Sequence, residues 1–126
     1  MGEEFQSSRP IYLQLVDRIC GQIIRNERKP GDKLPSVREM ALNSGVNPNT
    51  VQRTYSELER MMVVETRRGQ GTFVTENMDV LNNLREELSV DIIQTFIHNM
   101  AEMGFTPQEM IEILMRSIDS NNGGVE

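Results

Sequence analysis

The chain has 126 residues, of which 37% are hydrophobic and 25% are charged, and its formal net charge is −6, a composition typical of a folded chain rather than a disordered one. The length leaves no room for a second full-sized domain, and one Cys with one His cannot build a disulfide or a zinc site. No apolar run is long enough to cross a bilayer, so we predict a cytoplasmic protein without metal, cofactor or membrane partner.

Residues 10–26 are predicted to form the first helix, because Pro10 suits a first helical position and apolar side chains follow at steps of three and four residues. The stripe consists of Tyr12, Leu15, Val16, Ile19 and Ile23. Cys20 lies within the same pattern, so we expect it to pack in the core. The Lys-Pro-Gly-Asp sequence at residues 29–32 breaks the pattern and predicts a turn.

Two short helices are predicted next. Ser36 and Glu39 have capping-box spacing, so a helix begins at Ser36, and Gly45 can end it in a left-handed cap. Asn47 as N-cap and Pro48 at the first position start another helix. Its expected inward stripe is Val51, Tyr55, Leu58 and Met62. Two helices separated by a short turn that contains Gly indicate a helix-turn-helix.

Residues 63–67 and 71–74 are short β-type runs on either side of Arg68-Gly69-Gln70. Two such strands around a turn with Gly predict a hairpin, which we call the wing. At its tip, Arg67 and Arg68 adjoin Gly69 and Gly71, whose small size lets the backbone approach a phosphate or the minor groove. A turn that simply requires glycine accounts for the glycines equally well.

From about Asn77 the chain is predicted to form an acidic helical arm. Residues 1–76 carry 11 Lys and Arg against 10 Asp and Glu, whereas residues 77–126 carry 2 against 9. The acidity therefore lies in the arm, and the N-terminal part can present a locally basic face. The first arm helix has an apolar stripe of Leu81, Leu84, Leu88, Ile92, Phe96 and Met100. Gly104 ends it, and Thr106, Pro107 and Glu109 have the pattern that starts a last helix.

The polar face of the third helix is the candidate reading surface. A step of about 100° per residue places Asn49, Arg53 and Ser56 opposite the buried stripe, with Thr50 and Gln52 beside them. Arg can grip guanine through two donors, and Asn or Gln can pair with adenine in two places. Such a face can equally be a solvated helix surface.

Arg38, near the start of the second helix, can reach a phosphate or a base while Ser36 helps to bind the DNA backbone. Alternatively, Arg38 is a surface residue supported by Glu39 or Glu57. His98 has no nucleophile or second ligand at recognisable spacing, so we expect it to be structural or solvent-exposed. No catalytic motif is present in the sequence, and we predict that the chain is not an enzyme.

The stretch from Pro10 to Val74 resembles the winged-helix domain of the GntR family of bacterial transcription regulators. The matching motifs, in order, are PIYLQL, PGDKLPSVREMA, SGVNPNTVQRTYSELE and GQGTFV. The short C-terminal part, with TPQEMIEIL, is similar to the YtrA-like subfamily, whose tail is a pair of dimerisation helices. The resemblance implies DNA contacts at Ser36, Arg38, Asn49, Thr50, Gln52, Arg53, Arg68, Gly69 and Gly71.

We therefore predict a mostly α (α+β) fold, with a winged helix-turn-helix DNA-binding domain at residues 1–76 and a two-helix dimerisation arm at residues 77–126. The predicted dimerisation residues are Leu84, Leu88, Phe96 and Met100, which we expect to share a helix face. A homodimer then binds a nearly palindromic double-stranded DNA operator, as a repressor. The alternative is a winged-helix adaptor that binds proteins through its acidic arm. A small-molecule effector is left unassigned, since the larger family members' effector domain has no counterpart here.

Overall fold

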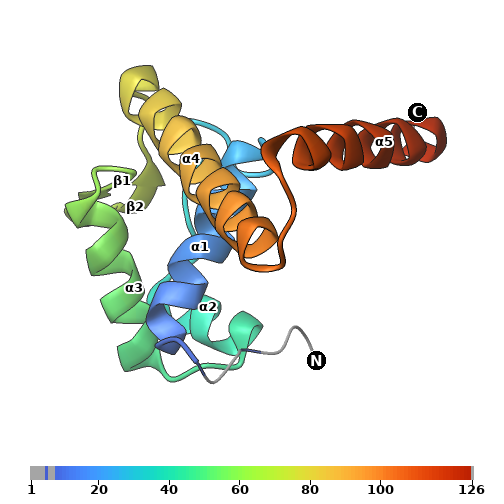
Figure 1. The fold of residues 1–126 in the computed structure, drawn as a ribbon. Coiled ribbons are helices and arrows are strands. Elements are labelled where there is room, and N and C mark those ends of the chain that lie inside the picture. The colour runs from blue at the N-terminus through green and yellow to red at the C-terminus, as the bar shows by residue number, and fades with distance from the viewer. Residues whose placement is uncertain (1–4, 6–7, 126) are drawn as a thin grey trace. The chain divides into compact units, whose positions relative to one another are not determined.

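The computed structural model describes residue 5 and residues 8–125, with side chains as far as residue 121. In chain order the elements are α1 (Ile11–Ile24), α2 (Val37–Ser44), α3 (Pro48–Arg60), β1 (Val64–Arg67), β2 (Gly71–Val74), α4 (Met78–Glu102) and α5 (Pro107–Val125) (Figure 1). The predicted fold class is confirmed, because helices dominate and the two strands form one small antiparallel sheet. Contacts divide the chain into two compact units within α4, the first ending at Arg85 and the second beginning at Glu86.

The core of the first unit forms where α1 and α2 pack against α3 (Figure 1). The predicted α1 stripe lies inward, and Leu15, Ile19 and Cys20 are each 1% exposed. On α3, Val51 and Leu58 are fully buried. The prediction that Met62 belongs to the inward stripe of α3 is wrong. The helix ends at Arg60, and Met62 takes a left-handed conformation (φ 67°) and is 64% exposed. Periodicity continues in the sequence beyond the point where the backbone leaves the helix.

The local start and stop signals of α2 and α3 are confirmed. Ser36 Oγ accepts from the Glu39 N–H at 3.1 Å, and Glu39 Oε1 accepts from the Ser36 N–H at 2.9 Å, which completes the capping box. Gly45 ends α2 with φ 68°, in the left-handed region that glycine adopts without a Cβ penalty. Asn47 Oδ1 caps α3 by accepting from the Asn49 N–H at 2.7 Å.

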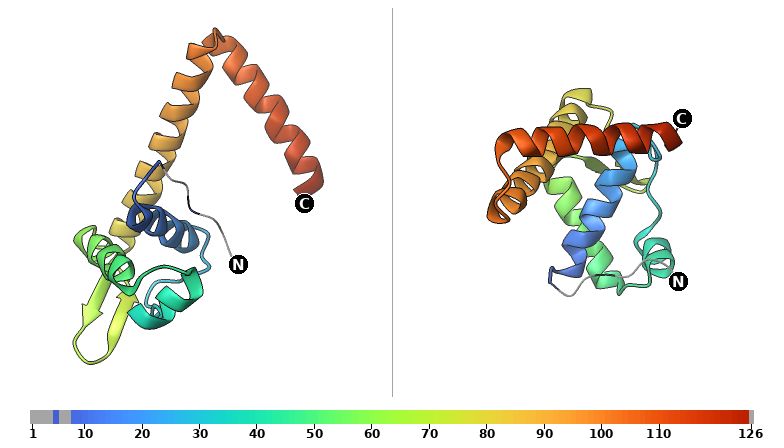
Figure 2. Two further views of the ribbon diagram at one scale, coloured as in Figure 1. Left: turned by 90° about the horizontal axis from the view of Figure 1, so that it is seen from below. Right: turned by 45° about the vertical axis from the view of Figure 1, so that its right-hand side comes forward.

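The wing is a hairpin in which β1 and β2 pair from Val64 with Val74 to Arg67 with Gly71. The segment before α2 runs along the other edge of β2. The Leu34 N–H donates to the Thr72 carbonyl at 2.8 Å, and the Val74 N–H donates to the Asp32 carbonyl at 2.8 Å. These bonds tie the start of α2 to the wing. In Figure 2 (left) the hairpin extends from the end of α3 beside this segment.

The second unit contains the C-terminal part of α4 and α5. The turn at Gly104 lets α5 fold back from α4 (Figure 2, left). Thr106 and Glu109 form the predicted capping box, with hydrogen bonds of 2.8 and 3.2 Å between each backbone N–H and the other side chain. The predicted start of the last helix is therefore confirmed.

The expectation that Leu84, Leu88, Phe96 and Met100 share one helix face needs correction. Each four-residue step advances about 40° around an α-helix, so Leu84 and Met100 differ by about 160°. Leu84 is 5% exposed and belongs to the first unit, whereas Ile92 of the same stripe is 68% exposed. Leu84 is thus already buried in the single chain, and Leu88, Phe96 and Met100 are half-buried.

Candidate nucleic-acid interface

The outer face of α3 carries the predicted reading residues. Asn49, Gln52 and Arg53 are exposed, and Thr50 is half-buried. Within the described part of the chain, the Asn49 and Gln52 side chains have no hydrogen-bond partner, so both amides are available to a ligand. The Arg53 guanidinium lies 4.0 Å from the centroid of the Tyr12 ring on α1. This cation–π contact holds Arg53 against α1, and the sequence reasoning missed it.

Two buried hydroxyls fix α3 on its neighbours. Tyr55 Oη donates to the Pro35 carbonyl at 2.7 Å, which joins α3 to the residue before the α2 cap. Burial raises the pKa of Tyr55 to about 12, so the phenol keeps its proton at neutral pH. The adjacent Thr54 Oγ1 lies 2.9 Å from the Thr50 carbonyl and 3.2 Å from the Tyr12 carbonyl on α1. The reading face is therefore displayed on a helix that is tied both to α1 and to the segment before α2.

Arg38 is exposed at the second position of α2, and neither of the carboxylates that could have neutralised it does so. Glu39 is bound in the capping box, and Glu57 pairs with Arg60, whose hydrogen bond lowers the pKa of Glu57. Within the described residues, Arg38 therefore presents an unpaired guanidinium. Ser36 lies beside it, with its hydroxyl accepting from the Glu39 N–H and its own proton free to be donated.

The two arginines at the wing tip differ in availability. Arg67 lies 4.2 Å from the centroid of the Phe73 ring and 3.7 Å from Glu65 Oε1, so it is held on the hairpin. Arg68 is exposed and makes no ion pair with a described carboxylate. Gly69 has φ 75° in the turn, and nothing lies within 4 Å of where its Cβ would be. An open turn with one free arginine can approach a phosphate closely.

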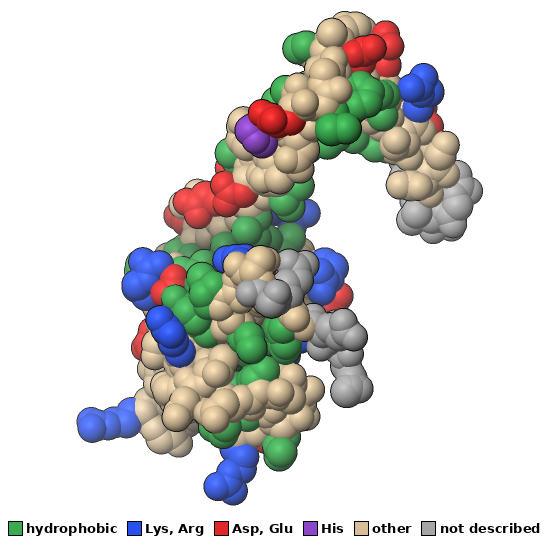
Figure 3. Space-filling view, turned by 60° about the horizontal axis from the view of Figure 1, so that its bottom comes forward, with side chains coloured by type: hydrophobic (Ala, Val, Ile, Leu, Met, Phe, Trp, Pro, Cys, Tyr) green, Lys and Arg blue, Asp and Glu red, His purple; other side chains and the backbone are tan. Residues whose placement is uncertain are grey.

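Charge pairing separates the cations of the first unit into two groups. The arginines paired with a carboxylate are Arg9 with Asp17, Arg25 with Glu27, Arg60 with Glu57 and Arg67 with Glu65. Lys33, Arg38 and Arg68, which flank the helix-turn-helix and the wing, have no such partner among the described residues. Figure 3 shows basic side chains that project clear of the surface. The sequence reasoning did not single out Lys33, although it directly precedes the buried Leu34.

The other chemistry-bearing side chains have structural surroundings. Cys20 is buried, which raises the pKa of its thiol to about 12 and leaves it protonated and unreactive. His98 is exposed, as expected. In residue 5 and residues 8–125, no group of three or more His, Cys, Asp or Glu could hold a metal ion, and no helix is long and apolar enough to cross a membrane.

A helix-turn-helix with an adjoining wing, and unpaired cations on both, defines a DNA-binding protein of the winged helix-turn-helix class. Residues 11–74 match the model of the bacterial regulatory proteins of the gntR family. This chain belongs to the GntR family.

Two relatives place the match in detail. The HTH-type transcriptional regulator YhcF of Bacillus subtilis (strain 168) is 54% identical over 112 residues, which cover 89% of this chain and 93% of that protein. The HTH-type transcriptional repressor YtrA of the same organism is 50% identical over 72 residues, which cover 57% of this chain and 55% of that protein. The first match includes the helical second unit, and the predicted likeness to short family members is confirmed.

Solved structures agree. A GntR family transcriptional regulator from Listeria monocytogenes has a TM-score of 0.84 at 36% identity, over 89% of this chain and 98% of that one. The DNA-binding domain of AraR, in complex with operator ORR3, has a TM-score of 0.52 at 28% identity, over 60% of this chain and 88% of that one. The chain is thus a transcriptional regulator and not an enzyme, as the sequence predicts.

Proposed function

We propose that this regulator is a homodimeric repressor that binds a nearly palindromic DNA operator. The observation that carries the proposal is the set of unpaired groups on the first unit, namely Arg38 on α2, the amides of Asn49 and Gln52 on α3, and Arg68 on the wing. Repression is supported by the relative YtrA, which is named a repressor. A protein that occupies a promoter needs no activation module to repress it.

Each predicted residue has a chemical role in this proposal. Arg38 and the Ser36 hydroxyl bind the phosphate backbone at the start of α2, where helix N-terminal N–H groups add favourable dipoles. Asn49, Thr50, Gln52 and Arg53 face base edges in the major groove, and Arg53 leaves the Tyr12 ring to do so. Arg68, Gly69 and Gly71 bring the wing against the backbone or the minor groove.

We infer that the second unit is the dimerisation arm. It exposes large apolar side chains on both helices, with Ile93 at 45%, Ile97 at 40% and Ile111 at 53% exposed. Figure 3 shows hydrophobic side chains on the surface of the helical arm. An apolar pocket of about 520 Å³ lies between α4 and α5, lined by Ile93, Phe96, Ile97, Ala101, Phe105, Pro107, Met110, Ile111 and Leu114. An apolar surface of this kind marks an interaction site, and a second copy of the arm has the matching chemistry.

The DNA part of the proposal is tested by selecting the sequence that the purified chain binds from a random duplex library. We expect a selected site with two related half-sites about one helical turn apart, or a multiple of that distance. Fluorescence anisotropy on the selected site then gives the affinity. Failure to enrich any sequence, together with an affinity that does not change between low and physiological salt, would favour the protein-binding adaptor instead.

The dimer part is tested with Ile97→Glu in the full chain, because a charge on the apolar surface must be desolvated when two copies meet. Asn99→Glu places the same charge at an exposed polar position of α4 and is the matched control. We expect the control to sediment as a dimer and Ile97→Glu to dissociate and bind the operator more weakly, since the second reading head is no longer tethered. A parent chain that sediments as a monomer contradicts this role for the arm.

A further inference from the structure

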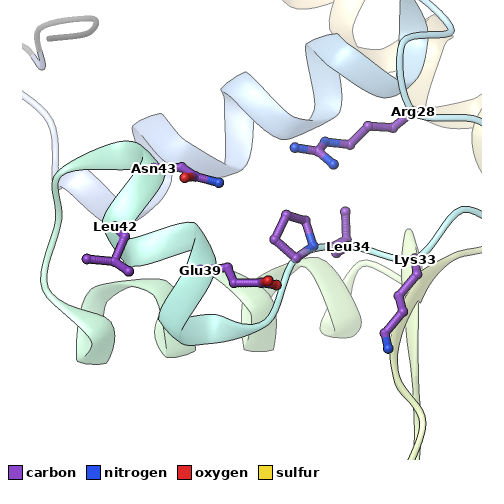
Figure 4. Close-up of a pocket in the computed structure, with 7 residues that line it drawn as sticks. Arg28, Lys33, Leu34, Glu39, Leu42 and Asn43 are labelled. Carbon is purple, nitrogen blue, oxygen red and sulfur yellow. The ribbon is translucent and has the colours of Figure 1, made fainter.

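Lys33 is held at the junction of the wing and the start of α2. It pairs with Phe73 in an antiparallel β-bridge, and the backbone hydrogen bonds of Asp32 and Leu34 to β2 fix its main chain on both sides. Side chains alternate along an extended segment, so Leu34 is buried at 2% exposure while Lys33 points outward. In Figure 4 the Lys33 side chain lies along the wing strands and away from Arg28.

Gly71 makes room for this lysine. A Cβ on Gly71 would lie 2.7 Å from Lys33 Cε, closer than two carbon atoms can approach without a shift. The lysine stem therefore crosses directly over the glycine. Gly71 also has φ 125°, a conformation that other residues rarely adopt. The position of the Lys33 side chain and the backbone conformation therefore require glycine at residue 71, whether or not Gly71 contacts DNA.

The Lys33 ammonium has no carboxylate partner among the described residues. The carboxylates of its neighbours are directed to backbone groups: Asp32 accepts from the Lys29 N–H at 2.8 Å, and Glu39 accepts from the Ser36 N–H at 2.9 Å. Lys33 also borders an open pocket of about 510 Å³ (Figure 4). Arg28, the other cation of that pocket, donates through Nε to Gln22 Oε1 at 2.6 Å. An unpaired ammonium on a fixed backbone beside open space can accept an anion.

We propose that Lys33 binds a backbone phosphate of double-stranded DNA, and that Gly71 acts as a positioning residue for it. This inference rests on the proposed operator binding and adds a contact that the family resemblance did not assign. Lys33 precedes Ser36 and Arg38 in the chain and pairs through its backbone with Phe73 of the wing, so its phosphate contact links the two parts of the reading surface. The ammonium acts as a point charge with three donors, and the contact is independent of DNA sequence.

The first experiment measures the affinity of the full-length chain and of Lys33→Gln for the selected operator and for a scrambled duplex, at several salt concentrations. We expect Lys33→Gln to weaken binding about three- to tenfold per subunit on both duplexes, and to reduce the slope of log affinity against log salt by about 0.9 per subunit, or about 1.8 for the dimer. Arg25→Gln, which removes a charge already paired with Glu27, is the control and should leave the slope unchanged.

A parent chain that binds no duplex overturns the proposed function and this inference with it. A parent chain that binds its operator, with Lys33→Gln equal to it in affinity and slope, overturns the phosphate contact alone. A loss on the operator without a loss on the scrambled duplex also contradicts the proposal, because a phosphate contact carries no sequence information.

The second experiment tests the role of Gly71 with a double-mutant cycle. Gly71→Ala pushes the lysine stem aside, so it should weaken DNA binding and flatten the salt slope; when Lys33 is already Gln, Gly71→Ala should leave the salt slope unchanged and weaken binding less than it does in the parent. Gly69→Ala is the control, because Gly69 also has a positive φ but nothing lies within 4 Å of its Cβ position, so the substitution strains the backbone without a clash. Its effect on DNA affinity should add to that of Lys33→Gln. Additive effects for Gly71→Ala would show that it does not act through Lys33.

Discussion

Tyr55→Phe tests the link between the two helices of the helix-turn-helix. The tyrosine is 6% exposed, and its hydroxyl donates to the Pro35 carbonyl at 2.7 Å, one residue before the α2 cap. Phenylalanine keeps the buried ring and removes only the hydroxyl. Because the Pro35 residue is half-buried, water can partly replace the lost donor. We therefore expect a loss near the middle of the usual range for one net hydrogen bond, about 1 kcal/mol.

Urea unfolding followed by circular dichroism, at one protein concentration, measures this loss. A change of about 1 kcal/mol lowers the midpoint by about 0.5–1 M with an unchanged slope, and lowers Tm by about 4–8 °C for a unit of this size. Tyr12→Phe is the matched control, because the Tyr12 ring contacts Arg53 while its hydroxyl has no described hydrogen-bond partner. Its free energy of unfolding should stay within about 0.5 kcal/mol of that of the parent.

The contribution of the Tyr55 hydroxyl also depends on pH. Burial raises the pKa of the folded phenol to about 12, whereas an exposed phenol titrates near 10. The stabilisation is therefore complete below about pH 10 and is lost as pH rises from 10 toward 12, because only the unfolded chain then releases the proton. Equal midpoints for parent and Tyr55→Phe at neutral pH would refute the hydrogen bond as the link between α2 and α3.

Three other outcomes follow from the structure. Arg38→Ala should weaken operator binding by about 1–3 kcal/mol without lowering Tm. Arg25→Ala removes a cation that is paired with Glu27, so it should change the operator affinity measured by fluorescence anisotropy little. Equal losses of affinity for the two variants would contradict the argument that Arg38 is available because it is unpaired. The logarithm of the operator affinity should fall steeply and linearly with the logarithm of the salt concentration, and an affinity that does not change with salt would exclude phosphate contacts. Burial raises the pKa of Cys20 to about 12, so the stability of the parent should fall as pH rises above about 9. In Cys20→Ala the free energy of unfolding should no longer fall between about pH 9 and 10, and a fall equal to that of the parent would argue against a buried thiol.

Local rules explain why so much of the first unit could be predicted. The Ser36 and Glu39 capping box, the Gly45 cap and the Asn47 N-cap each depend on residues within four positions of one another, and all three form as expected. The same holds for Thr106 and Glu109 in the second unit. Such signals are readable because side chain and backbone meet without any help from the rest of the fold.

The features that the sequence concealed involve residues far apart in the chain. Arg53 stacks on Tyr12, and Lys33 pairs with Phe73 and crosses Gly71, contacts between segments about 40 residues apart that no periodicity encodes. The periodic spacing of apolar residues also gave one wrong prediction, at the end of α3. Met62 continues the α3 pattern after the backbone has left the helix. The DNA and dimer contacts remain proposals, since they depend on partners outside the single chain.

The pairing of residues 31–34 with β2 sets a limit on how the connection between α1 and α2 can vary in length. The Gly31 N–H donates to the Val74 carbonyl at 2.9 Å, and the Leu34 N–H donates to the Thr72 carbonyl at 2.8 Å, so both ends of this segment are fixed to the same strand. One residue inserted between them would shift the register and exchange the two faces, bringing Lys33 inward and Leu34 into water. Insertions should therefore be accommodated in residues 25–30, the turn that precedes Gly31, whose backbone hydrogen bonds are to α1 and within the turn rather than to the wing.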